Sequence, residues 1–274
     1  MLGKMERPAM FCSKCGAALS ANDKFCLKCG EAVFAGTEKA VPSVVPVVTP
    51  SPTVPPSISF RDPTKLTTWL KYFLYASLIL DAIALLSGLL QYQLLSDFSL
   101  GVYSSETLAT SAAEANDKRQ QIVAVFQSGV AITTIIVFAM WIHRANFNSR
   151  ALGAQDMKFT PGWSVGYYFI PFLNLWRPYQ AMKEIWKTSK NPIAWEGEER
   201  GAILPWWWFF YLVAGMFGNA SFRTSMRAKE VHELITATGI TIVSDIVSIP
   251  ATIIAIALVG RIYKMQMSHA VRRI

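Results

Sequence analysis

The sequence predicts an all-α membrane protein: a four-helix transmembrane bundle with an interfacial or re-entrant segment, preceded by a small four-cysteine zinc ribbon on a proline-rich linker. Three observations lead to this prediction. All four cysteines of the 274-residue chain occur as two CxxC pairs near its start. Hydrophobic residues make up 52% of the chain and charged residues only 16%, which is unusual for a soluble domain. Four apolar stretches then follow, each close to the ~20 residues that a membrane span requires.

The cysteine pattern predicts one tetrathiolate zinc site within a ribbon at residues 10–31. Cys12 and Cys15 form one pair, Cys26 and Cys29 form the other, and each pair is followed by a glycine that tolerates a left-handed turn. A phenylalanine precedes each pair, and we expect both rings to pack over the site. Four thiolates complete the coordination shell, so the zinc is expected to be structural and to provide the ribbon's folding energy.

Three alternatives to zinc stay open for these cysteines. Disulfides are one, but CxxC pairs in a reducing compartment more often bind metal or carry out redox chemistry. A thioredoxin-like redox pair would need a βαβ scaffold, which is absent from the sequence. Iron in a rubredoxin-like site is the third alternative. The short stretch between the two pairs favours zinc.

Residues 32–65 are predicted to be a linker. It holds seven of the chain's 14 prolines, which are Pro42, Pro46, Pro50, Pro52, Pro55, Pro56 and Pro63. Such a segment favours extended polyproline conformations of roughly 3.1 Å per residue and has no packed core. We expect a spacer; a ligand for a proline-binding partner module is the alternative.

The transmembrane domain is expected over residues 66–274. Its spans are predicted at about residues 69–92, 122–142, 203–222 and 240–259. If both chain ends are cytoplasmic, 21 of the 26 Lys and Arg residues lie inside, as the positive-inside rule requires. The net charge of +8 then faces anionic lipid headgroups, and nucleic acid is a poorer partner because the basic residues are dispersed. We therefore expect a multi-pass protein of the cell (inner) membrane.

The segment at about 161–188 is predicted to be interfacial or re-entrant. The apolar residues between Trp163 and Trp176 are too few to cross a bilayer, and a proline interrupts them. An amphipathic helix is expected to open at Pro178 and to end before Asn191-Pro192, with Glu184 on its polar face.

Tryptophans concentrate near the predicted inner ends of the spans and in the inner loop. All nine do so: Trp69, Trp141, Trp163, Trp176, Trp186, Trp195, Trp206, Trp207 and Trp208. We expect most of them to be interfacial anchors, with an aromatic ligand cage as the alternative.

Two groups of polar residues are candidate sites in the membrane domain. Asp81 and Asp245 lie within predicted spans, where a carboxylate is expensive and should face the bundle interior. They could carry a proton or cation together with nearby polar residues, which are Gln127, Thr133, Thr134 and Ser244. The alternative is a protonated aspartate in an interhelical hydrogen bond. The second group could form the floor of a site or gate on the inner face, or simply an anchor: Arg144, Asn148, Asn174, Arg177 and Tyr179.

Several strings carry a family resemblance. They are Trp141-Ile-His-Arg144 with Asn148, Thr160-Pro-Gly-Trp163, Ile170-Pro-Phe-Leu-Asn-Leu-Trp-Arg-Pro-Tyr-Gln180 and Pro205-Trp-Trp-Trp208. This part of the chain resembles a bacterial multi-pass family known as domain of unknown function 4328. Residues 11–30 resemble the short zinc-ribbon domain that often opens bacterial membrane proteins. The resemblance implies a four-span bacterial integral membrane protein and no known activity.

The function expected from these features is binding or regulation, not catalysis. The sequence has no HExxH motif, no P-loop and no Gly-x-Gly-Asp string beside either intramembrane aspartate, so we expect no enzyme. A closed zinc site on a tether is expected to recruit a protein partner or to sense a state at the inner leaflet, as a binding, regulatory or scaffolding module. A homo-oligomer is a further expectation. The alternative function is a small transporter or channel that uses Asp81 and Asp245.

Overall fold

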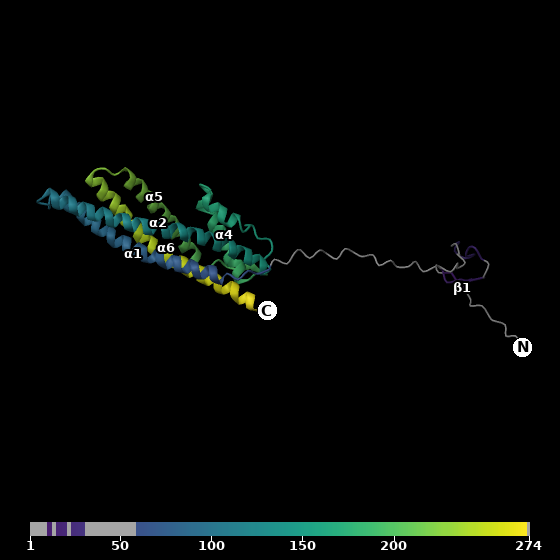
Figure 1. Cartoon of the computed structure of the whole chain (residues 1–274). Helices are drawn as coiled ribbons and strands as arrows, with labels where there is room; N and C mark the ends of the chain where they lie inside the picture. Colours follow the sequence, from purple (N-terminus) through teal and green to yellow (C-terminus); the bar gives the residue numbers. More distant parts are fainter. Residues whose placement is uncertain (1–9, 13–14, 21–22, 31–58, 273–274) are drawn as a thin grey trace. The chain divides into compact units, whose positions relative to one another are not determined.

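The computed structural model describes residues 10–12, 15–20, 23–30 and 59–272 (Figure 1). The chain divides into two compact units, Met1–Pro55 and Pro56–Ile274. Positions 32–58 of the predicted linker lie outside the described residues. Each unit is described by itself below.

The first unit contains the cysteines and a two-stranded antiparallel sheet. Strands β1 (Met10–Phe11) and β2 (Ala18–Leu19) pair directly. Each CxxC pair ends in the same turn, in which the glycine N–H donates to the carbonyl of the first cysteine: Gly16 to Cys12 at 2.9 Å and Gly30 to Cys26 at 2.8 Å. Both glycines have φ of +72°. These positive φ values confirm the predicted left-handed turns. Glycine occupies both positions because any residue with a side chain would be strained there.

Four long helices form the second unit and run along one another (Figure 1). They are α1 (Thr64–Ser99), α2 (Glu106–Ala151), α5 (Ile203–Arg227) and α6 (Val231–Val271). α6 packs along both α1 and α5, while α2 packs along α1. The spatial order is therefore α2, α1, α6, α5.

Three described helices, α1, α2 and α6, are long and apolar enough to cross a membrane. Each extends several residues beyond the predicted span, because its ends continue as polar helix past the apolar stretch. α5 is not among the three. Its 25 residues would reach about 38 Å, but tryptophan, glycine and polar residues lower its hydropathy.

Short elements connect α2 to α5. They are α3 (Trp163–Gly166), η1 (Tyr167–Phe169), η2 (Leu173–Leu175), α4 (Arg177–Lys190) and η3 (Trp195–Gly197). α4 has proline in its first turn and Asn191 at its C-cap, which agrees with the helix predicted from Pro178 to Asn191. It packs against α2, α5 and α6 near the end where α1 begins and α6 finishes (Figure 1).

The apolar core of this unit lies at the α4 end of the bundle. Leu70 of α1, Ile185 of α4 and Leu204 of α5 are completely buried there. Trp141 and Trp207 belong to this core with 1% and 4% exposure. The prediction that most of the nine tryptophans are interfacial anchors does not hold for these two. They are packing residues instead, because the helix ends converge around α4 and cover the rings.

Glu184 is buried too, with 5% exposure, so its predicted place on the polar face of α4 is wrong. Its carboxylate accepts the backbone N–H groups of Lys158 at 2.6 Å and Phe159 at 3.1 Å. These two N–H groups belong to the irregular segment after α2, where no helix supplies an acceptor. The polar face of α4 is correspondingly narrow: Lys183 and Lys187 are only partly buried, while most of their neighbours are buried.

Candidate functional sites

The four cysteines of the first unit converge on one point. Their sulfurs all lie within 4.8 Å of one another. The Sγ atoms of Cys12 and Cys29 are 3.7 Å apart, and those of Cys15 and Cys26 are 3.6 Å apart. These separations are far longer than the ~2.05 Å of a disulfide bond. A tetrahedral zinc with Zn–S bonds of about 2.3 Å separates its sulfurs by about 3.8 Å, so the cluster fits that ion.

The geometry leaves no coordination position for a water or a substrate. Four thiolates complete a tetrahedral shell, and such sites are structural. Cys12 and Cys26 are 5% and 2% exposed, so one ligand of each pair forms the small interior of the unit. A bound zinc would hold the two knuckles together without supplying a reactive centre.

The phenylalanines that precede the two pairs face outward. Phe11 and Phe25 are 63% and 61% exposed, so the prediction that their rings pack over the site is wrong. Successive side chains of an extended segment point to opposite sides, and the buried Cys12 and Cys26 therefore turn their predecessors out. Leu27 is 96% exposed as well. The described residues of the ribbon thus present three large apolar side chains to their surroundings.

A second candidate site lies among α1, α2 and α6. The Gln127 Nε2 atom donates to Oδ1 of Asp81 at 3.2 Å and to Oδ1 of Asp245 at 3.4 Å. The two aspartates are 8% and 6% exposed. Residues from three helices therefore meet around one amide, as a shared polar site requires.

This polar cluster is under-satisfied. Within the part of the chain that the structure describes, Asp245 Oδ2 is buried without a hydrogen-bond partner, and neither aspartate forms an ion pair. The other suggested members turn elsewhere. Thr133 and Thr134 donate to carbonyls of their own helix, and the Ser244 hydroxyl lies toward Gly218 of α5.

Two of the five inner-face candidates hold the start of α1. Asn148, which is fully buried, accepts the Arg61 N–H at 3.1 Å and donates to the Arg61 carbonyl at 2.8 Å. Arg144 donates to the Asp62 carbonyl at 3.4 Å. Trp141 donates from Nε1 to Thr67 Oγ1 at 3.1 Å. This string on α2 therefore fastens the segment that leads into α1.

The other three inner-face candidates lie on the 170–180 segment and connect mainly to α5. Asn174 accepts a hydrogen bond from the Tyr211 hydroxyl at 3.2 Å, and the Tyr179 ring lies 6.1 Å from that of Trp208. Arg177 donates to Gln180 at 3.3 Å. The structure therefore places the five residues in two separate groups, each of which joins backbone segments or helices.

A buried network at the same end of the bundle gave no sequence signal. Gln266 of α6 is 1% exposed and donates to the Ala145 carbonyl at 2.8 Å and the Ser189 hydroxyl at 3.0 Å. Thr188 donates to the Ser149 hydroxyl at 2.8 Å. These residues are 39 to 121 positions apart, and isolated serines and glutamines in helices do not reveal such pairings from sequence.

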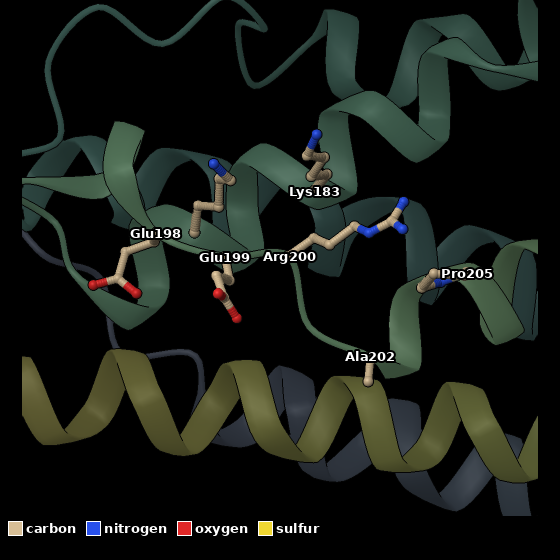
Figure 2. A pocket seen from close by; sticks show the side chains of 7 residues that line it. Lys183, Glu198, Glu199, Arg200, Ala202 and Pro205 are labelled. Atoms are coloured by element: carbon tan, nitrogen blue, oxygen red, sulfur yellow. The ribbon is translucent and has the colours of Figure 1, made fainter.

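A charged hollow of about 520 Å³ lies between α4 and the start of α5 (Figure 2). In Figure 2 the Arg200 side chain extends toward Pro205, while Glu198 lies at the opposite end. Glu198 pairs with Lys190 at 2.6 Å, which lowers the pKa of this carboxyl below its ordinary value. Charges of both signs line the hollow and partly neutralise each other, so it is a weaker candidate than the aspartate cluster.

Two family models match the chain. The family described as Domain of unknown function (DUF4328) matches residues 104–264, more than half of the chain, and a zinc-ribbon domain matches residues 11–33. Both resemblances found in the sequence are thereby confirmed. The first match covers every string from Trp141 to Trp208 and begins after α1. Comparison with curated proteins and with solved structures found no match.

Proposed function

Because the chain belongs to the DUF4328 family, whose description names no activity, we propose a function from the geometry: an integral membrane protein that recruits a protein partner through its zinc ribbon. The ribbon is then a binding or regulatory module, and the helical unit is its anchor. The observation that carries this proposal is the closed arrangement of four sulfurs within 4.8 Å, which offers stability without reactivity.

The surface of the ribbon supports recruitment. Phe11, Phe25 and Leu27 are each more than 60% exposed, whereas the buried side chains among the ribbon's described residues are Cys12 and Cys26. Aromatic residues are enriched at protein interfaces, and the two exposed rings are available to another protein. The partner we expect is a protein with a complementary apolar surface.

The proposed membrane arrangement has four spans. α5 joins α1, α2 and α6 as the fourth, because it packs along α6 and its length exceeds the hydrocarbon core. An even number of spans puts both ends on one side, and the basic residues favour the cytoplasm. The segment at 163–176, with its short helical turns, would lie at the inner interface. Protease protection of reconstituted vesicles tests this: with the ends outside the lumen, protease should remove the ribbon.

Capture of the partner tests the recruitment proposal. A full-length chain with Phe11→Ser, Phe25→Ser and Leu27→Ser should bind one zinc per chain but lose the proteins cross-linked to wild type in intact cells. Deletion of residues 1–40, which removes all four cysteines, should abolish zinc binding and lose the same cross-linked proteins. Ile193→Ser is the matched control, since Ile193 is 84% exposed on the membrane unit. An unchanged set of captured proteins in the triple variant would reject ribbon-mediated recruitment.

A small transporter or channel is the second candidate function. The observation that favours it is the double hydrogen bond of Gln127 to two buried aspartates, one of which leaves Oδ2 without a partner among the described residues. Two carboxyl groups this close in an apolar bundle need a proton or a cation to limit their repulsion. Such a group can be loaded and released during transport.

Flux measurements separate the two candidates. Proteoliposomes with a pH-sensitive dye inside should show proton flux that falls on Asp81→Asn and on Asp245→Asn. Asp97→Asn, at the end of α1, is the control and should leave the flux unchanged. Equal flux through all four proteins would remove the transporter from consideration and leave recruitment standing.

A further inference from the structure

An apolar groove of about 760 Å³ lies in the membrane unit between α2 and α5. α2 packs along α1 and α5 packs along α6, so these two outer helices form the walls. Leu74 of α1 and Ala255 of α6 line the groove between them. Val165 and Tyr168 belong to its lining and come from the connecting segment.

The dimensions of the groove suit a single chain of hydrocarbon. The lining residues run from Ala131 to Ile142 on α2 and from Trp207 to Gly218 on α5, a length of about 16 Å on each helix. That is about half of the ~30 Å hydrocarbon core, or one leaflet. A transmembrane helix is about 10–12 Å wide, so one 5.4 Å turn already fills roughly 500 Å³. A spanning helix is therefore too large to lie within the groove.

Gly215 keeps the α5 wall open. Within the described part of the chain, a Cβ atom at Gly215 would meet no atom within 4 Å. Ala214 and Gly218 beside it are small as well and also line the groove. A larger residue at position 215 would project into this space.

Tyr168, which lines the groove, has a hydroxyl without a hydrogen-bond partner among the described residues. The Tyr168 hydroxyl is buried and, among residues 59–272, makes no hydrogen bond. The neighbouring Tyr211 hydroxyl is already used, because it donates to Asn174. A buried hydroxyl that lacks a partner destabilises the fold, so a bound acceptor would stabilise it.

We propose that this groove binds one acyl chain of a membrane phospholipid, with the ester carbonyl of that lipid accepting a hydrogen bond from Tyr168. The inference rests on the proposed function in one respect, namely that these helices cross the bilayer. The acyl chain lies along Gly215 and Gly218, and the ester lies near the connecting segment, which is expected at the interface. The ligand thus has the chemistry of the groove: apolar along its length and polar at one end.

Photo-cross-linking tests the proposal. The full-length protein is reconstituted in nanodiscs that contain phosphatidylethanolamine with a diazirine in its acyl chain, and the labelled peptides are mapped by mass spectrometry. Wild type should be labelled on residues 131–142 and 207–218. Gly215→Leu should reduce this labelling at least about five-fold. Gly129→Leu, at an exposed and open position of α2 outside the groove, should leave it unchanged.

Tyr168→Phe examines the polar end separately. Loss of one hydrogen bond of about 0.5–1.5 kcal/mol should reduce groove labelling about 2- to 10-fold, with the distribution along the helices retained. Competition with a saturated free fatty acid distinguishes the source, since a phospholipid site should lose little labelling. Strong competition by the fatty acid would overturn the assignment to phospholipid.

Further results would also overturn the inference. Equal groove labelling in wild type and Gly215→Leu would identify ordinary surrounding lipid, and cross-links between α2 of one chain and α5 of another would identify a second copy as the occupant. Carbonate extraction of the same samples reports membrane insertion. Failure of wild type to insert would overturn the proposed membrane role and this inference with it, whereas normal insertion with equal labelling would overturn this inference alone.

Discussion

Buried polar side chains at the α4 end of the bundle satisfy backbone groups that no helix pairs. Asn148 holds both polar groups of the Arg61 backbone, and Glu184 holds the N–H groups of Lys158 and Phe159. Each buried N–H that loses its acceptor costs about 1–3 kcal/mol. These residues therefore position the irregular segments on which the helix ends depend.

Glu184→Gln should destabilise the protein by about 1–3 kcal/mol. The glutamine oxygen can accept one of the two backbone N–H groups, but its NH₂ group then faces the other donor. Thermal unfolding in detergent should show a melting temperature lower by about 2–4 °C per kcal/mol. Glu199→Gln is the control, because Glu199 is exposed. Equal melting temperatures of both variants would contradict the role assigned to Glu184.

The same carboxyl makes stability depend on pH. Burial raises the pKa of Glu184 above its ordinary 4.5, although the hydrogen bonds from Lys158 and Phe159 oppose the rise. The folded state then holds the proton more tightly than the unfolded chain. The stability that this tighter proton binding contributes is fully present below the pKa of Glu184 in the unfolded chain. It is lost as the pH rises through the pKa of Glu184 in the folded state. The free energy of unfolding of wild type should therefore exceed that of Glu184→Gln by less and less as the pH rises above about 4.5. Unfolding curves of both proteins at several pH values measure this difference. A difference that grows with pH would contradict the prediction.

Gly201→Ala should lower the melting temperature more than Gly197→Ala does. A Cβ at position 201 would overlap the indole of Trp186, which is only 8% exposed and cannot move aside without disturbing the core. Overpacking of this kind costs about 1–3 kcal/mol. A Cβ at position 197 meets nothing within 4 Å in the described chain, so that variant is the matched control. Identical melting temperatures of the two variants would show that the Trp186 ring moves aside without cost.

Among the helices, α6 makes the central contacts because it packs along both α1 and α5. Its approach to α1 is close at Gly88, where an added Cβ would lie 3.1 Å from Cγ1 of Ile242. Small residues at such positions let helix backbones approach in a membrane, where packing contributes much of the association energy.

The boundaries of the helices, in contrast, are set by local sequence signals. α4 lies where Pro178 and Asn191 predict it, since caps and prolines act within one turn.

Gly88→Leu should weaken the α1–α6 contact. A leucine side chain must displace Ile242 or separate the helices, at a cost of about 1–3 kcal/mol. The expected result is a lower melting temperature and faster proteolysis in detergent. Gly129→Leu introduces the same side chain at an open position of α2 and should have little effect. A comparable drop in melting temperature in both variants would show that leucine destabilises these helices generally and not through the α1–α6 contact.

At the scale of the molecule, the chain consists of two units, and a different kind of interaction stabilises each of them. Among the described residues of the ribbon unit the buried side chains are cysteines of the sulfur cluster, while the second unit has an apolar core and interhelical packing. A metal contributes on the order of 10–16 kcal/mol to small zinc domains of this kind. The stability of one unit should therefore be independent of the other.

Zinc removal tests this independence. A chelator at neutral pH should release one zinc per chain and make residues 10–31 sensitive to protease. The melting temperature of the helical unit should remain unchanged, because none of its described residues belongs to the sulfur cluster. Cys26→Ser should reproduce the effect without a chelator. A helical unit that melts earlier after zinc removal would contradict this separation.

Local patterns in the sequence were sufficient to predict the cysteine cluster, the long apolar helices and the boundaries of α4. Each depends on residues within a few positions of one another, such as a two-residue gap, a run of apolar residues or a capping proline. Only the tertiary structure decided that Gln127 meets Asp81 and Asp245, which are 46 and 118 positions away from it in sequence. It also decided that Glu184 is buried and that Asn148 holds Arg61. Such contacts follow from which helices pair and in what register, and that choice is made by the summed packing of many side chains rather than by any local pattern.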